Sequence, residues 1–516
     1  MHIYPSSSKK SSLVFFEMFL FAILAFLYLY VSYHSYGYDD EYFNIRQIRE
    51  HDLLSLIQTI QQTDIHPPLS YMINKVLFNI LQDWTFVRMV SSVLFLASLF
   101  LFCRKTKNPV INIFFLLFLG LNPSVLLWTT SIRWYAYVLP LLVLLHIVPA
   151  YDRKWYWWYF FMICWFICML GYIGFLLMPV YFLFYWIQDQ HKFIHKLKRI
   201  LLPGSLFILL YVYQFYLFIT IHNRTELTGN QQVFDLFASI QSYVASTFSN
   251  QGLFPLTFFG ILSIVGMFLI CFHGLINVRT YLKEHTFLFL FAALSIITVF
   301  TGVAGKIRNL FLIEPSKVSF MLVGMSVKRG RWLWVLGVLF VLVANLAGIS
   351  NVVQHQQTTK NGWNIKMPET LAKLEGIERK NKATIYFTHH PSFSYHLTTK
   401  NKQVVSFYNG LYFDSSLIKT RVQQLDTSKS YDIIFLVNYR GRSITENYFQ
   451  LMISTIDKMK ARAKQVDEYD LHEDPDFRIK QRFYPDYPRY TTRVIHLKEI
   501  SVDEDLLSVW EKNEYE

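Results

Sequence analysis

Long apolar runs separated by short polar breaks fill the first two thirds of the chain. A helix needs about 20 apolar residues to cross a bilayer, and about eleven runs of this kind occur before residue 350. They predict a polytopic α-helical membrane protein. The expected spans are Leu13–Tyr33, Phe86–Cys103, Val110–Leu127, Trp134–Pro149, Trp155–Leu170, Tyr172–Ile187, Ile200–Ile221, Phe254–His273, Phe287–Val303, Leu310–Met325 and Trp332–Ile349.

The pattern changes after residue 350, where no apolar run is long enough to span a membrane. Short β-rich runs alternate there with helical patterns, which is typical of a small α/β domain. We therefore expect a membrane domain over residues 1–350 and a soluble domain over residues 351–516. The β-rich runs are Ala383–Phe387, Val404–Tyr408, Ile433–Asn438 and Thr491–Leu497, and the helical patterns are Pro368–Arg379 and Thr445–Lys464.

The composition supports this class and gives an orientation. Of the 516 residues, 53% are hydrophobic and only 16% are charged, whereas soluble proteins devote about a quarter to charged residues. A disordered or nucleic-acid-binding chain is excluded. Basic loops stay in the cytoplasm, and with a cytoplasmic N-terminus the inner segments hold 16 Lys and Arg. Their only acids are Asp152, Asp189 and Glu284, so this excess accounts for the whole net charge of +13.

With a cytoplasmic N-terminus, the first loop, 34–85, lies on the outer face. An odd number of spans then places the domain 351–516 on that same face. Three consecutive carboxylates, Asp39, Asp40 and Glu41, begin this loop. One apolar face then runs from Ile45 to Ile60 and predicts a single amphipathic helix in the membrane interface. The loop ends with Asp64-Ile65-His66-Pro67-Pro68-Leu69, where the prolines stop the preceding segment and begin a helix over Leu69–Leu81.

These motifs, in this order, resemble the GT-C glycosyltransferases of the protein O-mannosyltransferase and aminoarabinose-transferase type. Two further elements fit the resemblance. Ser131–Tyr137, at the outer start of the fourth span, is similar to the Arg-x-Tyr segment of that family. Lys306-Ile307-Arg308, followed by Pro315, resembles the basic segment that many relatives carry before a late helix. The resemblance covers residues 1 to about 350 and implies a GT-C-like fold.

The resemblance implies an inverting transfer of a sugar from a polyprenyl-phosphate donor to a protein, lipid or cell-envelope glycan at the outer membrane face. Such a reaction needs a carboxylate that accepts the acceptor proton and cations that stabilise the leaving phosphate. By alignment, Asp40 is the candidate base, with Asp39 and Glu41 beside it. The candidate substrate-binding residues are Asp64, His66, Arg133, Tyr137, Lys306 and Arg308.

Simpler interpretations remain open at this point. The three carboxylates fit a solvated loop, His66 fits a structural hydrogen-bonding residue, and Lys306 and Arg308 fit snorkelling anchors. A transporter or lipid flippase is the main rival, because Glu314 and Lys317 fall within the tenth span. A non-catalytic GT-C relative acting in envelope assembly is a third hypothesis.

No metal-ligand spacing or Gly-rich phosphate loop occurs in the sequence, so we expect no cofactor or nucleotide; a divalent metal is not indicated but stays an open alternative. The expected partners are the lipid-linked sugar, its acceptor and membrane lipids. The expected location is the plasma or inner membrane, if the protein is bacterial.

Overall fold

The structure of the chain is a computed structural model. It describes residues 7–35, 39–63, 66–147, 155–171, 173–189, 191–222, 240, 243–244, 258–277, 286–300, 312–354, 367–378, 383–388, 391–406, 408–409, 412–413, 430–438, 456–457, 459–473 and 490–501. The chain divides into two compact units. The helical unit comprises residues 1–35 and 51–355, and the C-terminal unit comprises residues 36–50 and 356–516.

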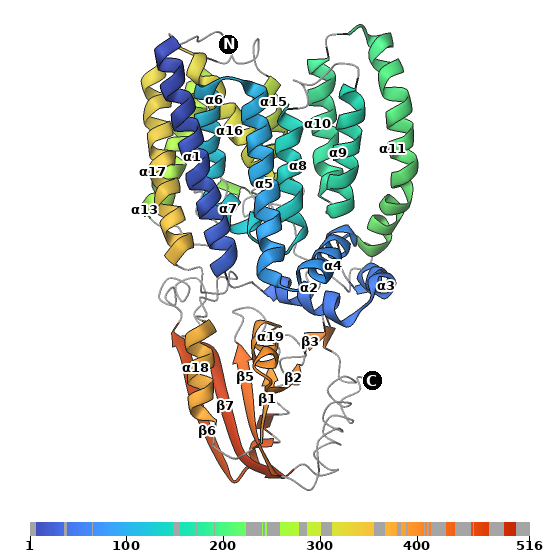
Figure 1. Cartoon of the computed structure of the whole chain (residues 1–516), viewed down its shortest axis with the longest axis vertical. Coiled ribbons are helices and arrows are strands. Elements are labelled where there is room, and N and C mark those ends of the chain that lie inside the picture. Colours follow the sequence, from blue (N-terminus) through green and yellow to red (C-terminus); the bar gives the residue numbers. More distant parts are fainter. Residues whose placement is uncertain are drawn as a thin grey trace. The chain divides into compact units, whose positions relative to one another are not determined.

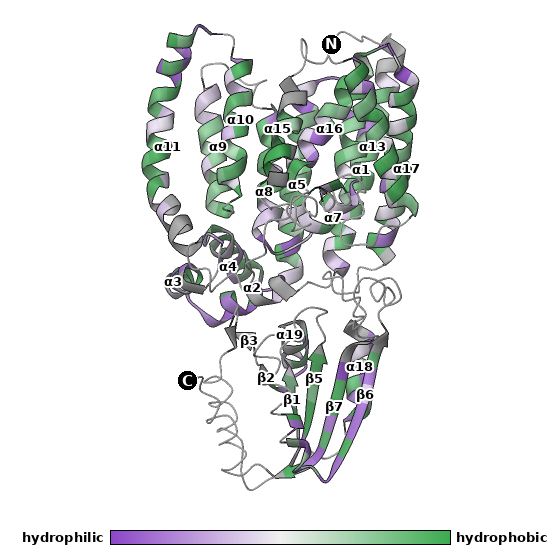
Figure 2. Cartoon of the chain, turned by 180° about the vertical axis from the view of Figure 1, so that it is seen from behind, coloured by the Kyte–Doolittle hydropathy of each residue, from purple (hydrophilic) through white to green (hydrophobic). Residues whose placement is uncertain are grey.

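The helical unit consists of apolar helices packed side by side (Figure 1). Hydrophobic residues continue along the outward faces of α11, α13 and α17 (Figure 2), where Leu209, Leu275 and Leu346 are more than half exposed. Exposed apolar side chains along whole helices are suited to lipid. The elements are α1 (Ser7–His34), α3 (Leu53–Thr63), α4 (Leu69–Leu81), α5 (Trp84–Thr106), α6 (Pro109–Phe115), the π-helical turn η1 (Leu116–Gly120), α7 (Pro123–Thr129), α8 (Trp134–Ile147), α9 (Tyr156–Leu170), α10 (Gly174–Gln188), α11 (Phe193–His222), α13 (Phe258–Ile276), α15 (Thr286–Phe300), α16 (Glu314–Val323), the 3-10 turn η7 (Gly324–Ser326) and α17 (Arg331–Gln354).

Each expected span overlaps a helix or a helix pair. Within the described residues, α1, α5, α13 and α17 are long and apolar enough to cross a membrane, and the bent pair Pro109–Gly120 with Pro123–Thr129 raises the number to five. Helices α4, α8, α9 and α10 are shorter but apolar. The chain is therefore a polytopic α-helical membrane protein with a C-terminal α/β domain. The number of about eleven spans stays a prediction.

Side-chain caps determine where several of these helices begin. The carboxylate of Asp83 accepts a hydrogen bond from the backbone N–H of Thr85 at 2.6 Å and caps α5. Helix α5 ends at Lys107, which has a left-handed backbone (φ 52°), and the next residue, Asn108, caps α6 through the N–H groups of Val110 and Ile111. A side-chain acceptor at this position satisfies backbone donors that the first helical turn leaves unpaired.

The span expected over Val110–Leu127 is a bent helix pair, so the prediction of one uninterrupted helix there is wrong. The helix passes through the π-helical turn and stops at Leu121, and the two halves are bent by 69°. Pro123 has no backbone N–H to continue the hydrogen-bond ladder, while the side chain of Asn122 accepts from Ser124 and Val125 and starts α7. A break at this point therefore leaves no backbone N–H group without a hydrogen bond.

The prediction of one amphipathic helix through Ile45–Ile60 is also wrong. Two helices occur, α2 (Asp39–Glu50) and α3. The side chain of Asp52 accepts from the backbone N–H of Ser55 at 2.8 Å, so a new helix starts there. The apolar face is confirmed in part, since Ile45, Ile48, Leu56 and Ile60 are buried while Leu53 is 40% exposed.

The C-terminal unit contains a mixed five-stranded sheet in the order β2-β1-β5-β7-β6. Strand β1 is parallel to β2 and β5, while β7 is antiparallel to β5 and β6. Helix α19 connects the parallel strands β1 and β2, as a βαβ unit requires. The bounds are α2 as above, α18 (Met367–Ile377), β1 (Thr384–Thr388), α19 (Pro391–Thr399), β2 (Gln403–Ser406), β3 (Tyr408–Asn409), β4 (Tyr412–Phe413), β5 (Ser430–Asn438), β6 (Gln465–Glu473) and β7 (Tyr490–Ser501).

The four β-rich runs and the helical pattern at Pro368–Arg379 are confirmed as strands and as α18. The helical pattern at Thr445–Lys464 lies mostly outside the described residues. Strand β6 is not predicted, because its sequence QVDEYDLHE is acidic. It is an edge strand, and ion pairs with β7 stabilise it, from Asp467 to Lys498 at 2.5 Å and from Asp470 to Arg493 at 3.1 Å.

A His–Asp pair is buried in the sheet of the C-terminal unit. The Nε2 atom of His496 lies 3.4 Å from an oxygen of Asp432, and both side chains are fully buried. The second oxygen of Asp432 accepts from the backbone N–H of Glu499 at 3.1 Å. Burial lowers the pKa of His496 below its ordinary value, although Asp432 acts in the opposite direction.

Helices α13 and α17 touch backbone to backbone at two glycines. A Cβ atom on Gly266 would lie 2.6 Å from the carbonyl oxygen of Gly337, and a Cβ on Gly337 would lie 2.6 Å from the carbonyl oxygen of Gly266. The backbone cannot move aside as a flexible side chain can, so any larger residue forces the two helices apart.

Gly266→Ala should lower the melting temperature of the protein, with a loss of about 1–3 kcal/mol from overpacking. Gly204→Ala in α11 is the matched control, because its Cβ would approach only side-chain atoms, of Phe161 at 3.3 Å and of Ile200 at 3.4 Å. Thermal unfolding in detergent micelles, followed by tryptophan fluorescence, compares the two. Equal melting temperatures would contradict the close packing of α13 and α17.

The buried pair of His496 and Asp432 makes the stability of the C-terminal unit depend on pH. At pH values above the ordinary histidine pKa, His496 is neutral in both the folded and the unfolded chain. Below that pKa the unfolded chain binds a proton that the folded chain does not, so the unit loses stability as the pH falls. Amide hydrogen exchange in β5 and β7, corrected for its intrinsic pH dependence, should report weaker protection at pH 5.5 than at pH 7.5. The same decline in His496→Gln would assign the effect to other groups.

Candidate functional site

Three residues that the sequence singled out come together where α4 meets α8. His66 precedes the Pro67–Pro68 pair that leads into α4, and Arg133 immediately precedes α8, which contains Tyr137. Arg133 and Tyr137 are both buried. Arg133 is four residues before Tyr137, and both side chains contact α4.

Two polar contacts join these helices. Nη1 of Arg133 donates to the hydroxyl oxygen of Tyr71 at 3.4 Å, and the hydroxyl of Tyr137 donates to Oδ1 of Asn74 at 2.5 Å. Tyr71 and Asn74 are three residues apart on α4 and are both buried. The two contacts are about one helical turn apart along each segment, so together they fix the register of α4 against α8.

His66 extends this group through an aromatic contact. Its ring lies 5.4 Å from the ring of Trp134, centroid to centroid. Gly171 makes room for Trp134 from the other side, since a Cβ atom there would lie 2.5 Å from the indole. We name His66, Tyr71, Asn74, Arg133, Trp134 and Tyr137 the α4–α8 seam.

The seam offers a guanidinium held in place by burial and by Tyr71, and the imidazole of His66 contacts Trp134, the residue next to Arg133. A fixed, planar guanidinium binds phosphate and carboxylate oxygens better than a flexible ammonium does. Tyr71 and Asn74 were not predicted from the sequence. Their spacing of three was a weak signal, because Ser70, Lys75 and Asn79 are also polar in the run Leu69–Leu81.

The acidic residues belong to the other unit. Asp39 and Asp40 are the first two residues of α2, and Glu41 follows them and is fully buried. Helix α2 is part of the C-terminal unit, whereas the seam is part of the helical unit. Asp64, Lys306 and Arg308 lie outside the described residues.

A second polar group is buried where the bent helix pair meets α16. Lys317 donates to Glu314 at 2.6 Å, and Nδ2 of Asn122 donates to the second oxygen of Glu314 at 2.8 Å. All three side chains are almost completely buried. Farther along α16, Ser319 contacts Nδ1 of His146 at 3.1 Å. These contacts attach α16 to α7 and α8, which is a structural use of the charges that suggested a transporter.

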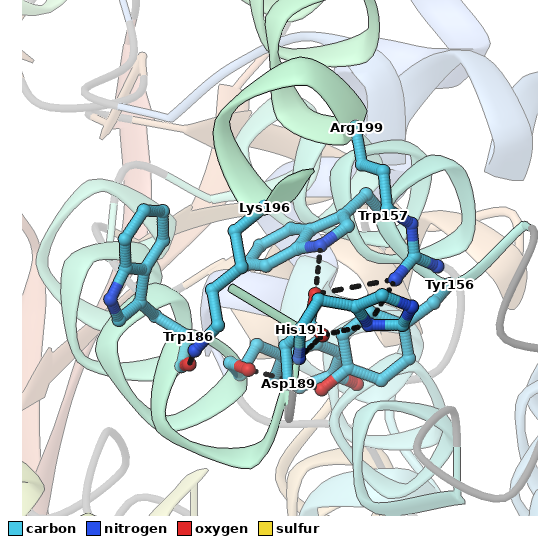
Figure 3. Close-up of polar contacts among 8 residues, drawn as sticks. Tyr156, Trp157, Trp186, Asp189, His191, Lys196 and Arg199 are labelled. Atoms are coloured by element: carbon cyan, nitrogen blue, oxygen red, sulfur yellow. Dashed lines mark hydrogen bonds and ion pairs between the residues drawn. The ribbon is translucent and has the colours of Figure 1, made fainter. Parts of the chain in front are cut away.

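A third polar group closes the turn between α10 and α11 (Figure 3). The carboxylate of Asp189 accepts from Trp157 Nε1 at 2.9 Å, from His191 Nδ1 at 2.6 Å and from Arg199 at 3.4 Å. Burial raises the pKa of Asp189, but the hydrogen bonds from His191 and Trp157, together with the charge of Arg199, outweigh it and lower the pKa. Lys196 donates to the carbonyl oxygen of Trp186 at 2.7 Å. The group fixes the geometry of this turn.

Among the described residues, no cluster of three or more His, Cys, Asp or Glu has the arrangement of a metal site.

Comparison with known proteins gives matches in structure but none in sequence. No protein-family model matches the chain, and no curated protein matches it in sequence. The crystal structure of ArnT from Cupriavidus metallidurans, described as bound to undecaprenyl phosphate, matches with a TM-score of 0.49 and 10% sequence identity. The match covers 93% of this chain and 97% of that one. A likeness of this size gives no information about the ligand or the activity of this chain.

The buried ion pair of Glu314 and Lys317 predicts that a single variant is less stable than the double variant. Lys317→Met leaves Glu314 buried without its ion-pair partner and should cost about 3–5 kcal/mol. Adding Glu314→Gln removes the second charge and should restore much of the lost stability. Thermal unfolding in micelles measures both variants, and a double variant as unstable as the single one would contradict the pairing.

Proposed function

We propose that this integral membrane protein is a glycosyltransferase of the GT-C type. It transfers a sugar from a polyprenyl-phosphate donor to an acceptor at the outer face of the membrane, with inversion at the anomeric carbon. The observation that carries the proposal is the α4–α8 seam. Arg133 is buried there against α4, the helix that begins directly after the His66-Pro67-Pro68 motif. A cation in this place suits a lipid phosphate, whose charge grows as the bond to the sugar breaks.

The proposed reaction is a direct displacement. An acceptor oxygen attacks the anomeric carbon, the bond from that carbon to the phosphate oxygen breaks, and the acceptor proton passes to the carboxylate of Asp40. Arg133 stabilises the leaving phosphate, with His66, Lys306 and Arg308 as further donors. Tyr137 lines the sugar pocket, while Asp39, Glu41 and Asp64 orient the acceptor or the cations. No cofactor or metal takes part in this scheme.

The proposed orientation rests on charge. The excess of Lys and Arg in alternate loops supports a cytoplasmic N-terminus, with α2 and the C-terminal domain on the outer face. Acceptors of this chemistry include proteins, lipids and cell-envelope glycans. We propose that the C-terminal domain helps to select or position the acceptor.

A transporter or lipid flippase is the second candidate function. The bent pair of helices α6–α7 and the buried Glu314 and Lys317 favour it, because discontinuous helices with buried charges are typical of transport sites. Since Glu314, Lys317 and Asn122 pair with one another, we rank it below the enzyme. Movement of a polyprenyl-phosphate sugar across vesicles without transfer of the sugar would favour it. A non-catalytic relative would neither transfer the sugar nor move the lipid-linked sugar across the membrane.

Asp40→Asn tests the proposed base. Membranes containing the protein are incubated with a panel of polyprenyl-phosphate-linked hexoses and pentoses, and mass spectrometry identifies the glycosylated product. Because a positioned base contributes about 10²–10⁴ in rate, the variant should lose transfer by at least a hundredfold while inserting normally.

Glu50→Gln is the matched control, because it removes a carboxylate at the other end of the same helix, where Glu50 pairs with Arg46. It should transfer at the wild-type rate. Unchanged transfer in Asp40→Asn would overturn the role of Asp40, and unchanged transfer in Asp39→Asn as well would overturn the whole active-site assignment.

A further inference from the structure

Helix α2 follows α1 closely in the sequence, yet its contacts assign it to the C-terminal unit. The partner of α2 in that unit is α19, more than 300 residues farther along the chain. The segment with the acidic residues is thus held by a helix that the sequence offers no reason to associate with it.

Aromatic and polar contacts join the two helices at both ends of α2. The hydroxyl of Tyr42 and Nε2 of His396 share a hydrogen bond of 2.7 Å, and the ring of Tyr42 lies 4.9 Å from that of Tyr395 and 5.1 Å from that of His396. The guanidinium of Arg49 lies over the ring of Tyr395, 5.3 Å from its centroid. Tyr42 and Arg49 are two helical turns apart and therefore lie on one face of α2. We name these four residues the α2–α19 anchor.

Helix α19 is itself fixed in the core of the C-terminal domain. Phe393 and Leu397, one turn apart, are buried in a cluster with Tyr386 of β1 and Val404 of β2. Tyr395 and His396 lie on another face of the helix and are only partly buried. One face of α19 thus packs against the sheet while another holds α2, so the sheet gives α2 a rigid support.

We infer that the C-terminal domain positions the catalytic helix, with His396 as a positioning residue for Asp40 that acts through Tyr42. The inference rests on the proposed function. Asp40 is two residues before Tyr42 in the same helix, so a shift of Tyr42 shifts the backbone of Asp40 with it. A misplacement of about 1 Å at a reacting group can cost a hundredfold in rate. The domain therefore contributes to the chemical step, apart from any contact with the acceptor.

Variants at the two partners test this inference in the full-length protein in membranes. Tyr42→Phe keeps the ring contacts and loses the hydrogen bond, and His396→Leu loses the imidazole. His396→Gln keeps a polar group at the place of Nε2 and should rescue. Tyr469→Phe is the matched control, because it removes a hydroxyl that contacts Asp467 on the exposed strand β6.

Two readouts are measured. Hydrogen exchange of the α2 amides should become faster in Tyr42→Phe and His396→Leu but not in Tyr469→Phe. With the polyprenyl-phosphate sugar that the wild type consumes, kcat should fall about tenfold to a hundredfold while KM for this donor is unchanged. The loss in the double variant Tyr42→Phe/His396→Leu should be close to that of His396→Leu alone, because both changes remove the same hydrogen bond.

The possible results separate two kinds of failure. A wild type that transfers no sugar overturns the proposed function, and this inference with it. An active wild type whose variants keep full kcat overturns the inference alone, as does unchanged exchange in α2. A raised KM for the donor with constant kcat also overturns it, because that result assigns His396 to donor binding.

Discussion

Polar side chains inside the helical unit must find partners on other helices, because neither lipid nor an apolar core supplies hydrogen bonds. This constraint fixes how the apolar helices pack. Tyr28 of α1 donates to the carbonyl oxygen of Gly120 in the π-helical turn, and Arg88 of α5 donates to that of Ser35 at the end of α1. The contact of Asn122 with Glu314 joins the bent helix pair to α16 in the same way. Apolar contact alone would allow these helices to rotate or slide.

The α4–α8 seam follows from the same constraint. Burying the charge of Arg133 costs free energy unless the guanidinium is hydrogen-bonded. Its position beside Tyr71 is therefore fixed, and Arg133 cannot move to the lipid-facing surface. The repeat of the contact one turn away, between Tyr137 and Asn74, holds α8 in register. Polar residues that stabilise the helix pair thus also preorganise a cation at the start of α8, which is what recognition of a phosphate needs.

Hydropathy predicts this fold well, because burial in lipid demands long apolar runs whatever the details of packing. It fails where a local group competes with the pattern. The Asn122-Pro123 pair breaks a run that is apolar on both sides, and Asp52 divides one apolar face into two helices. Strand β6 is acidic and forms because β7 supplies Lys498 and Arg493. In the site, single residues such as Arg133 can be found from the sequence, but their partners on α4 depend on three-dimensional packing.

The assignment of α2 to the C-terminal unit has no local signal at all. Tyr42 and His396 are 354 positions apart, and neither residue stands out in its own segment. The consequence is a division of labour: the cations of the seam belong to the helical unit, while the acidic helix belongs to the unit built on the sheet. The role proposed for Asp40, that of a base, needs an ionised carboxylate, which is less costly to hold outside the apolar helices than among them. The role proposed for Arg133, to stabilise the leaving lipid phosphate, needs a cation among the membrane helices, where Arg133 is buried. Holding α2 on α19 meets both demands, because the carboxylates are then supported by the sheet and Arg133 by the membrane helices.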